Sequence, residues 1–405
     1  MRSIERSVCL FLLILLAGSC TGGSAQQRAG GTEGELAQAG VAFGFKLLQE
    51  IHSQEAAGEN IFISPLGVAA ALGIVYNGAT GETAAAMRET LALGELTLAE
   101  LNAGYRGLFD RLMRLDPAVE FLPANSIWYK QGFDVRQDFL AVNCEYFQAR
   151  VAALDFASPT AAATINDWVD EVTRGRIEEI VDDPIDPEVL MYLINAVYFN
   201  SDWTIRFDSK LTADRPFHLT DGSVKPVPIM TYPGPVEIQR FSDGDVDAID
   251  LPYAGKAYSM TILMPAAGGD INLLVESLDS ERWQMIVTGL APTRTNVLMP
   301  KLRLEYELEL QDALSTLGMG IAFTDAADFS KICSTGLFIS RIKHKAFVDL
   351  NERGTEASAA TAVELKRGAP APLFAVDRPF LFAIRELSSG TILFMGRIAD
   401  PTLAS

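Results

Sequence analysis

The chain has 405 residues, 49% of them hydrophobic, so it can bury a sizeable core, which excludes an intrinsically disordered protein outside the N-terminal segment. It carries 52 acidic against 33 basic residues, a formal net charge of −19. Because no basic field is present to release counterions, nucleic acids and anionic membrane surfaces are not expected as partners.

The first twenty residues have the layout of an export signal. Two arginines precede an apolar run, Val8–Ala17, which is too short to span a bilayer. The ending Leu16–Cys20 is similar to a bacterial lipoprotein cleavage box, in which the cysteine is lipidated. Two outcomes stay open: a lipid anchor at Cys20 on a bacterial envelope membrane, or plain secretion into the extracellular space. Residues 21–34, rich in Gly, Ser and Gln, are predicted to form a flexible tether.

The next part of the chain has helical patterns. Apolar residues recur at helical spacing over three segments, 35–52, 82–91 and 97–115. A further helix is expected over 65–76, because Ser64 can cap free N–H groups and Pro65 suits the first helical position. This helix is apolar all round, which predicts that it is buried.

From Phe121 onward strands alternate with helices and later dominate. Strands are predicted over 121–129 and 151–156, and helices over 135–149 and 161–180. The apolar run 189–199 is expected as a central strand covered on both faces. The remaining elements are strands over 216–219, 224–228, 246–251, 258–264, 296–304 and 338–350, a helix over 308–319, and a hairpin of 379–385 with 391–397. Helices first and strands later, without a linker, indicate a single α+β domain over 35–405.

The stretch Glu352–Arg367 is compatible with two structures. Every second residue from Thr355 to Leu365 is small or apolar and the other set holds the charges, which is typical of a half-buried strand. The Ala and Glu content equally suits a surface helix, and the pattern leaves both open. The stretch continues into Lys366–Pro372, whose composition is that of an exposed loop and a protease target.

Ten motifs, in their order and spacing, are similar to those of the serpin family, and they cover the chain from Glu35 to its end. They are Asn60–Pro65, Asn77–Thr83, Ile165–Val169, Thr173–Ile177, Asn195–Phe199, Met299–Lys301, His344–Ala346, Glu352–Ala360, Asp377–Phe380 and Phe394–Arg397. Each motif is weak alone, but the ordered set is very specific. The resemblance is to inhibitory members of the family, and the cleavage box at Cys20 indicates a bacterial protein.

The resemblance implies an α+β serpin fold of about nine helices and three β-sheets, with an exposed reactive-centre loop over residues 352–376. In the family a protease cleaves this loop, which then inserts into the main sheet and traps the acyl-enzyme. We therefore expect a metastable, monomeric serine protease inhibitor that acts as a suicide substrate. Its partner is the target serine protease, held in a covalent acyl complex, and no cofactor or metal is implied.

Loop insertion requires small side chains at the start of the loop, the hinge. The resemblance assigns to it Glu352, Gly354, Thr355, Ala357, Ser358, Ala359 and Ala360. Family members that do not inhibit usually carry bulky, charged or Pro residues in this stretch. Such a non-inhibitory serpin, acting as a carrier, chaperone or storage protein, is the alternative function.

Two further clusters are implied by matching positions. The shutter, a polar cluster beneath the opening sheet, matches Ser64, Asn195 and His344, and a small hydroxyl residue expected near Gly67 is missing. The breach, where the loop first enters, matches Trp203, Lys301 and Glu352, and we predict an ion pair between Lys301 and Glu352. From the residue alone, His344 is expected to be a hydrogen-bonded core histidine and not a catalyst.

The reactive bond is predicted by counting along the loop. The commonest family spacing from Gly354 puts the cleaved bond between Gly368 and Ala369. Loops one residue shorter put it between Arg367, which follows Lys366, and Gly368. Because a trypsin-like pocket binds Arg or Lys through a buried carboxylate, we predict cleavage between Arg367 and Gly368 by a trypsin-like protease. Elastase-like, subtilisin-like and cysteine proteases are the alternative targets.

An enzyme with its own catalytic site is the rival class. The chain holds three histidines, no Gly-x-Ser-x-Gly motif and no Gly-rich phosphate loop. Outside the export signal two cysteines remain, Cys144 and Cys333, which have neither metal-ligand spacing nor a disulfide framework. We therefore expect structural thiols, no metal site and no enzymatic activity.

Overall fold

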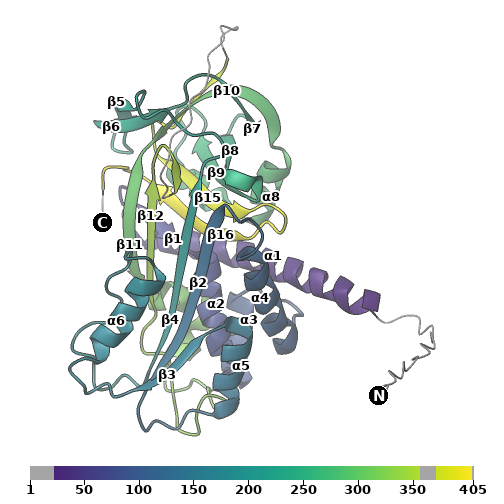
Figure 1. Ribbon diagram of the computed structural model, residues 1–405, viewed down its shortest axis with the longest axis vertical. Helices are drawn as coiled ribbons and strands as arrows, with labels where there is room; N and C mark the ends of the chain where they lie inside the picture. Colours follow the sequence, from purple (N-terminus) through teal and green to yellow (C-terminus); the bar gives the residue numbers. More distant parts are fainter. Residues whose placement is uncertain (1–21, 356–370, 404–405) are drawn as a thin grey trace, which may run out of the picture.

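The computed structural model of the protein describes residues 22–355 and 371–403 (Figure 1). The export signal expected over 1–20, with Cys20, lies outside the described residues. So do the loop residues 356–370.

The described chain begins with a long helix, α1 (Gly22–Gln54). The prediction of a flexible tether over 21–34 is therefore wrong from Gly22 onward. Gly and Ser favoured a tether, but a helix already formed over 35–52 extends by one hydrogen bond for each added residue. Glu33 also pairs with Arg111 on a neighbouring helix (Oε2–Nε 3.4 Å), which ties this segment to the body.

Five more helices follow: α2 (Pro65–Tyr76), α3 (Gly81–Thr90), α4 (Leu98–Leu112), α5 (Gln137–Phe147) and α6 (Ala161–Val172). As predicted, Ser64 caps α2 by accepting a hydrogen bond from the Gly67 N–H, and α2 is buried along nearly its whole length. The helix predicted over 161–180 ends at Val172, because Arg174 and Gly175 adopt positive φ angles of 57° and 75°.

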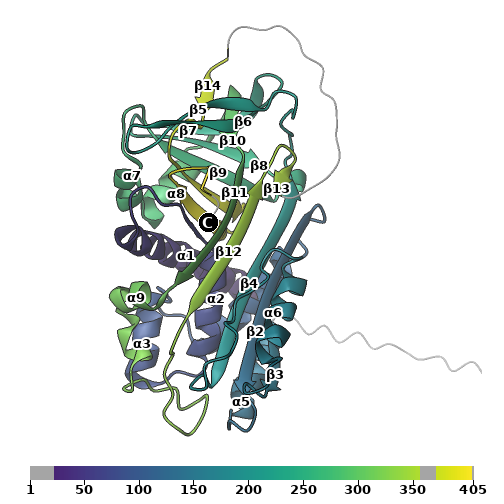
Figure 2. The same cartoon turned by 90° about the vertical axis from the view of Figure 1, so that its left-hand side faces the viewer.

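A six-stranded sheet runs through the long axis of the molecule (Figure 2). Its strand order is β11 (Leu302–Glu309), β12 (Lys343–Leu350), β13 (Gly354–Thr355), β4 (Met191–Asp202), β2 (Val119–Lys130) and β3 (Arg150–Leu154). β4 is a central strand, as predicted. Ile194 packs in the cluster that α6 covers, whereas Phe199 packs on the opposite face against the main core.

The other strands form a ten-stranded system. Its order is β1 (Ile61–Ile63), β16 (Ile392–Ile398), β15 (Phe380–Glu386), β9 (Tyr258–Pro265), β8 (Val246–Pro252), β7 (Val236–Ser242), β10 (Ala291–Pro300), β6 (Val224–Thr231) and β5 (Ala213–His218), with β14 (Leu373–Ala375) beside β10. β10 pairs with β7 through 291–295 and with β6 through 298–300. Two sheets thus meet in β10, and with the six-stranded sheet they account for the three predicted sheets.

Some predicted elements differ from the structure. The strand predicted over 296–304 is two strands, β10 and β11, in different sheets, because the alternation of apolar residues continues across the bend at Lys301. The helix predicted over 308–319 begins later, after the end of β11, and consists of a short α9 (Gln311–Leu314) followed by a π-helix, η2 (Ser315–Met319), which is kinked at Gly318 with a φ of 110°. β7, α7 (Ile271–Ser277) and α8 (Ser280–Thr288) were not predicted.

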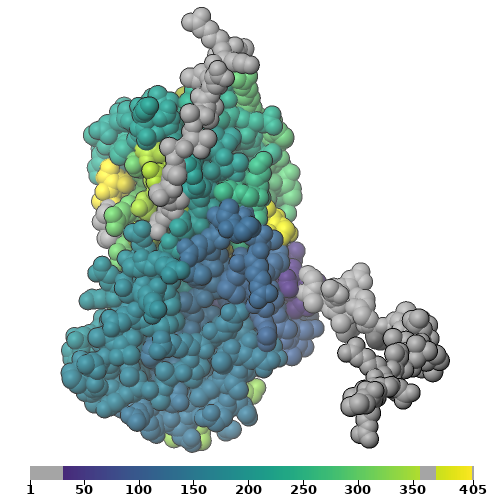
Figure 3. Space-filling model, viewed as in Figure 1, coloured from purple at the N-terminus to yellow at the C-terminus, as the bar shows by residue number. Residues whose placement is uncertain are grey.

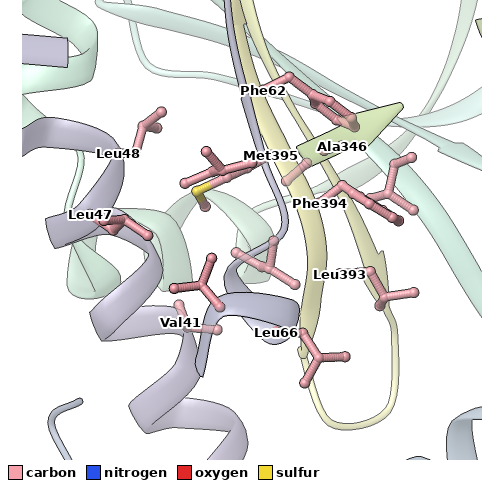
Figure 4. Close-up of a cluster of buried hydrophobic side chains, with 14 of the residues drawn as sticks. Val41, Leu47, Leu48, Phe62, Leu66, Ala346, Leu393, Phe394 and Met395 are labelled. Atoms are coloured by element: carbon pink, nitrogen blue, oxygen red, sulfur yellow. The ribbon is translucent and has the colours of Figure 1, made fainter. Parts of the chain in front are cut away.

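The main core lies where α1 and α2 pack against both sheet systems (Figure 4). Side chains from five elements meet there: Val41, Leu47 and Leu48 of α1, Phe62 of β1, Leu66 of α2, Ala346 of β12, and Leu393, Phe394 and Met395 of β16. Figure 3 shows that the segment from β2 to α6, in blue to teal, covers the lower half of one face. Through Ala346, β12 therefore packs against the same core as α1, α2, β1 and β16.

Candidate functional site at the hinge end of the six-stranded sheet

β13 lies between the ends of β4 and β12. Thr355 pairs with Leu350 of β12 and with Ser201 of β4, and Gly354 pairs with Asp202. Both pairings are antiparallel, so β4 and β12 run parallel to each other. Among the described residues, these two strands are joined in the sheet order through β13 alone. The end of the sheet at which β4 and β12 finish is called the hinge end here (Figure 2).

The described part of the hinge is a buried strand and not an exposed loop. Thr355 is 4% exposed. A Cβ atom at Gly354 would lie 2.0 Å from the backbone oxygen of Ser201, so a residue with a side chain does not fit there. At the other end of the predicted loop, β14 pairs with β10. The loop expected over 352–376 is therefore shorter at both ends.

A buried tyrosine holds Thr355 in the sheet. The hydroxyl groups of Thr355 and Tyr253 form a hydrogen bond of 2.9 Å. The Tyr253 ring stacks on Trp203 with centroids 4.6 Å apart and 11° between the ring planes. Burial raises the pKa of Tyr253, and the bond to Thr355 offsets this partly, so the group is a neutral phenol.

Three successive residues before Gly354 are fixed by the segment that follows β4. The indole Nε1–H of Trp203 donates to the Asn351 carbonyl (3.0 Å). The backbone N–H groups of Trp203 and Phe207 donate to the carbonyls of Arg353 (2.7 Å) and Glu352 (2.9 Å). Trp203 thus holds both the turn after β12 and the tyrosine that contacts Thr355, and its role at the entry point of the loop stays a prediction.

The predicted ion pair between Lys301 and Glu352 is confirmed. The Lys301 Nζ lies 3.0 Å from the Glu352 Oε2, and the Thr212 hydroxyl donates to Oε1 (2.8 Å). Burial alone raises the pKa of Glu352, but hydrogen bonds from its own backbone N–H, Thr212 and Lys301 outweigh this, and the net pKa is lowered. The carboxylate is therefore ionised at neutral pH and holds β11, β13 and the segment after β4 together.

A narrow gap lies directly ahead of Thr355, between β4 and β12. Its walls include Val197 and Phe199 of β4, and Phe347 and Asp349 of β12, and Arg176 of the segment after α6 lies beside it. The gap holds a volume of about 10 Å³ for water, roughly one molecule. The guanidinium of Arg176 lies 5.3 Å from the centre of the Phe347 ring. We call this gap the insertion track.

Ser64 and His344 contact each other beneath the sheet, as the shutter prediction implies. The Ser64 backbone N–H donates to the His344 Nε2 (3.1 Å), and the Ser64 hydroxyl donates to the Leu393 carbonyl (2.7 Å). Burial lowers the pKa of His344 to about 4. The imidazole is therefore neutral and accepts at Nε2, which makes it a hydrogen-bonded core histidine, as expected.

Asn195 belongs to a second, adjacent pair. Its Nδ2 donates to the Asn125 Oδ1 (2.7 Å), and the Asn125 amide donates to the Phe147 carbonyl (2.8 Å). A Cβ atom at Gly67 would lie 2.3 Å from the Asn195 Oδ1 and 3.0 Å from the Ser64 Oγ. The glycine thus lets Asn195 occupy the space in which the resemblance expects a small hydroxyl residue.

Several predicted site residues lie outside the described residues. They are the hinge residues Ala357, Ser358, Ala359 and Ala360, and the reactive-bond candidates Lys366, Arg367, Gly368 and Ala369. Conversely, the contacts of Tyr253, Thr212 and Asn125 were not predicted. Asn125 lies within β2, Thr212 directly before β5 and Tyr253 directly after β8, and their sequence neighbours carry no motif that indicates a partner.

The described ranges 22–355 and 371–403 contain no group of three or more His, Cys, Asp or Glu side chains that could hold a metal ion. No helix in this part of the chain is long and apolar enough to cross a membrane. Cys144 is exposed and Cys333 is buried, and both are free thiols.

Sequence relatives extend over most of the chain. An uncharacterized serpin-like protein of Thermococcus kodakarensis is 35% identical over 380 residues, which are 92% of this chain and 87% of the relative. The leukocyte elastase inhibitor of Bos taurus is 34% identical over 382 residues, 91% of this chain and 100% of the relative. Both proteins therefore match this chain through the hinge end and the track.

Solved structures give the same result. The native state of a thermophilic serpin, tengpin, superposes with a TM-score of 0.80 at 30% identity and covers 90% of this chain and 94% of its own. Human thyroxine-binding globulin complexed with thyroxine has a TM-score of 0.84 at 25% identity, and the match covers 92% of this chain and 100% of the globulin chain. The family model described as "Serpin (serine protease inhibitor)" matches residues 38–401. With its fold, hinge end and sequence all in agreement, the chain belongs to the serpin family.

Proposed function

We propose that the protein is an inhibitory serpin, a suicide substrate that traps a serine protease by inserting its cleaved loop into the six-stranded sheet. The observation that carries the proposal is the position of β13. Gly354 and Thr355 already lie between β4 and β12, and the insertion track continues directly ahead of them. Leukocyte elastase inhibitor, a relative whose name states protease inhibition, supports the same function.

The proposed reaction starts as ordinary proteolysis. The protease serine attacks the carbonyl carbon of Arg367, an ester forms, and the amine of Gly368 leaves with the proton from the serine hydroxyl. Residues after Thr355 then enter the track as a new strand before water hydrolyses the ester. About fourteen residues at roughly 3.3 Å each carry the tethered protease on the order of 46 Å.

The hinge composition supports insertion. The alternate residues after Thr355 are Ala357, Ala359 and Thr361, which are small enough to pass between two strands. Insertion converts unpaired backbone groups into sheet hydrogen bonds, each worth about 0.5–1.5 kcal/mol net. The native state is thus proposed to be metastable and held by kinetics.

Trypsin-like proteases are the proposed targets, and incubation with a protease panel tests this. Trypsin, an elastase, subtilisin and papain are each mixed with the protein and analysed on a denaturing gel. A gel-stable complex with trypsin and a released C-terminal peptide that begins at Gly368 are expected. A peptide that begins at Ala369 would move the target to elastase-like or subtilisin-like proteases.

A carrier function is the second candidate, because the chain is similar in structure to a globulin solved with thyroxine bound. In that case every protease of the panel cleaves the loop and leaves as active enzyme. Cleavage without any covalent complex, across the whole panel, would contradict the inhibitor proposal and favour the carrier.

A further inference from the structure

A cleft lies far from the hinge end, between α4, α5 and the segment after α9. It has a volume of about 620 Å³, within the range of about 300–1,000 Å³ that is usual for small-molecule sites. Figure 1 shows α4 and α5 in the lower half of the molecule, whereas Figure 2 shows β13 at the upper end of the sheet. The cleft takes no part in the proposed insertion of the loop.

The inner wall of the cleft is apolar with an amide floor. Phe139, Val142 and Tyr146 of α5 face Leu98 of α4 across it. The floor includes Asn102, which is 4% exposed.

The floor amide has spare hydrogen-bonding capacity. The Asn102 Nδ2 donates to the Asn77 Oδ1 (2.8 Å), and Asn77 in turn donates to the Asn102 Oδ1 (3.0 Å). An amide nitrogen carries two hydrogens. Within the described residues, the second N–H of Asn102 has no acceptor. The floor therefore offers a buried donor to an acceptor group of a bound molecule.

The mouth of the cleft is positively charged in a protein that is otherwise strongly acidic. Arg136 and Lys331 line it, together with one carboxylate, Asp138. In the described part of the chain, none of these three side chains has a hydrogen bond or an ion pair. Arg136 immediately precedes α5, and its side chain does not cap the helix. Two cations against one carboxylate leave one net positive charge at the mouth.

We propose that this cleft binds a small amphiphilic anion, that is, a molecule with an apolar body and one carboxylate or similar head group. The body lies against Phe139, Val142 and Tyr146. The head group is held at the mouth by Arg136 and Lys331, because charge-assisted hydrogen bonds to these groups are the strongest that the cleft offers. Asp138 opposes the anion and limits its affinity.

Isothermal titration of the full chain tests the site with octanoate as the probe, and with octylammonium and octanol as charge controls. Saturable binding of octanoate is expected, at least tenfold tighter than that of either control. The double variant Arg136→Gln/Lys331→Gln should weaken octanoate binding at least tenfold, as expected for the loss of one charge-assisted hydrogen bond. Ala99→Trp, an exposed position on the cleft wall, should abolish it.

Two further variants make the result specific. Asp138→Asn removes the opposing carboxylate and should tighten octanoate binding several-fold. Lys46→Gln removes an exposed cation on α1 that lies outside the cleft and should change nothing. Thermal melts confirm that each variant is folded. No octanoate binding at millimolar concentration, equal binding of octylammonium, or binding unchanged in Ala99→Trp would each overturn the proposal.

Discussion

At the hinge end, where β4 and β12 finish, β13 is held by buried contacts, whereas at the end where β4 and β12 begin the strands are linked by exposed ion pairs. The hinge-end contacts are the Tyr253–Thr355 hydrogen bond, the Trp203 stack and the Glu352 carboxylate, whose side chain is 13% exposed. Most of these groups are neutral, so salt should affect them little.

The opposite end depends on the segment between α6 and β4. Asp182 of this segment pairs with Lys343 of β12 (2.9 Å) and with Arg341 just before it (2.9 Å). Lys345 of β12 donates to the Glu179 carbonyl (3.2 Å) and pairs with Glu305 of β11 (2.7 Å). The Asp182 side chain is 64% exposed, so its ion pairs should weaken as the salt concentration is raised.

If the loop inserts as proposed, the two ends would control different steps. The hinge end would fix where insertion begins, because its contacts place Gly354 and Thr355 in register between β4 and β12. The opposite end ties the segment after α6 to β12 through Asp182–Lys343 and Glu179–Lys345. A strand that inserts between β4 and β12 would advance toward these contacts. Variants at the hinge end should therefore decide whether the loop inserts, and variants at the opposite end should change how fast it finishes.

Thr355→Arg should break the hinge end most severely. The arginine would place an unpaired charge beside Tyr253 in a buried site, which costs several kcal/mol. The loop should still be cut at the same bond, but active protease should be released, so the variant behaves as a substrate. Gel-stable complex at wild-type yield would contradict the role of β13. Thr355→Ser, which keeps the hydroxyl, is the control.

His344, near the start of β12, should make stability depend on pH. Its pKa is lowered from 6.5 to about 4 in the folded state, so the unfolded chain binds the proton more tightly. The neutral imidazole therefore contributes stability above pH 6.5, and this is lost as pH falls toward 4, by up to about 1.4 kcal/mol per pH unit. Urea unfolding at several pH values measures it, and His344→Gln should flatten this part of the profile.

Glu352→Lys should loosen the hinge end without blocking the track. It removes the partner of Lys301 and places two ammonium groups together, a change of roughly 1–2 kcal/mol once solvent screening of the half-exposed Lys301 is allowed for. We expect β13 to leave the sheet more often and loop–sheet polymers to form on mild heating. Size-exclusion chromatography after heating detects them. A variant as monomeric as the wild type would show that the ion pair does not hold the sheet.

Tyr253→Phe isolates one hydrogen bond of the hinge end. The Thr355 hydroxyl loses its partner in a buried site, while the stack on Trp203 remains, so a loss of about 0.5–1.5 kcal/mol is expected. A double-mutant cycle with Thr355→Val measures the coupling by denaturant unfolding. Additive effects of the two substitutions would show that the bond does not stabilise β13.

Asp182→Asn tests the opposite end and should have the smallest effect. The hydrogen bond from Lys343 is the main cause that lowers the pKa of Asp182, but the group is exposed, so the pair contributes about 0–1 kcal/mol. The rate of loop insertion, measured by stopped-flow fluorescence with a labelled protease, should be slightly higher in Asp182→Asn than in the wild type and should depend less on salt. Asp183→Asn, at the adjacent residue, is the control. A wild-type salt dependence in Asp182→Asn would remove this end from the insertion step.

Local patterns predicted most of the elements. The cap at Ser64, the alternation in β12 and the hairpin of β15 and β16 each depend on residues close together in the sequence, and all three are present. The failures have the same origin. The alternation of apolar residues from Asn296 onward does not indicate the bend at Lys301. The composition of residues 22–34 likewise does not indicate that Glu33 pairs with Arg111, which is distant in the sequence.

The contacts at the hinge end could be predicted only where the family resemblance identified both residues of a pair. Lys301 and Glu352 were paired on that basis, 51 residues apart in the sequence. The Tyr253–Thr355 bond joins residues 102 apart, and the bond from Thr212 to Glu352 joins residues 140 apart. No periodicity within either segment identifies such partners. The insertion of β13 likewise depends on the space between two strands, which only the three-dimensional structure contains.

The attachment of β14 makes the proposed cleavage one-way. β14 pairs with β10 in parallel, and the Asn296 backbone N–H and side-chain amide donate to the carbonyls of Pro372 (2.8 Å) and Ala371 (3.2 Å). The new amine end at Gly368 would thus stay within a few residues of β10 while the acyl end departs along the track. Religation needs both ends at one point, and their effective concentration falls toward zero once the tether no longer spans the distance. The pairing of the three residues of β14 with β10 would thereby prevent religation of the cleaved bond.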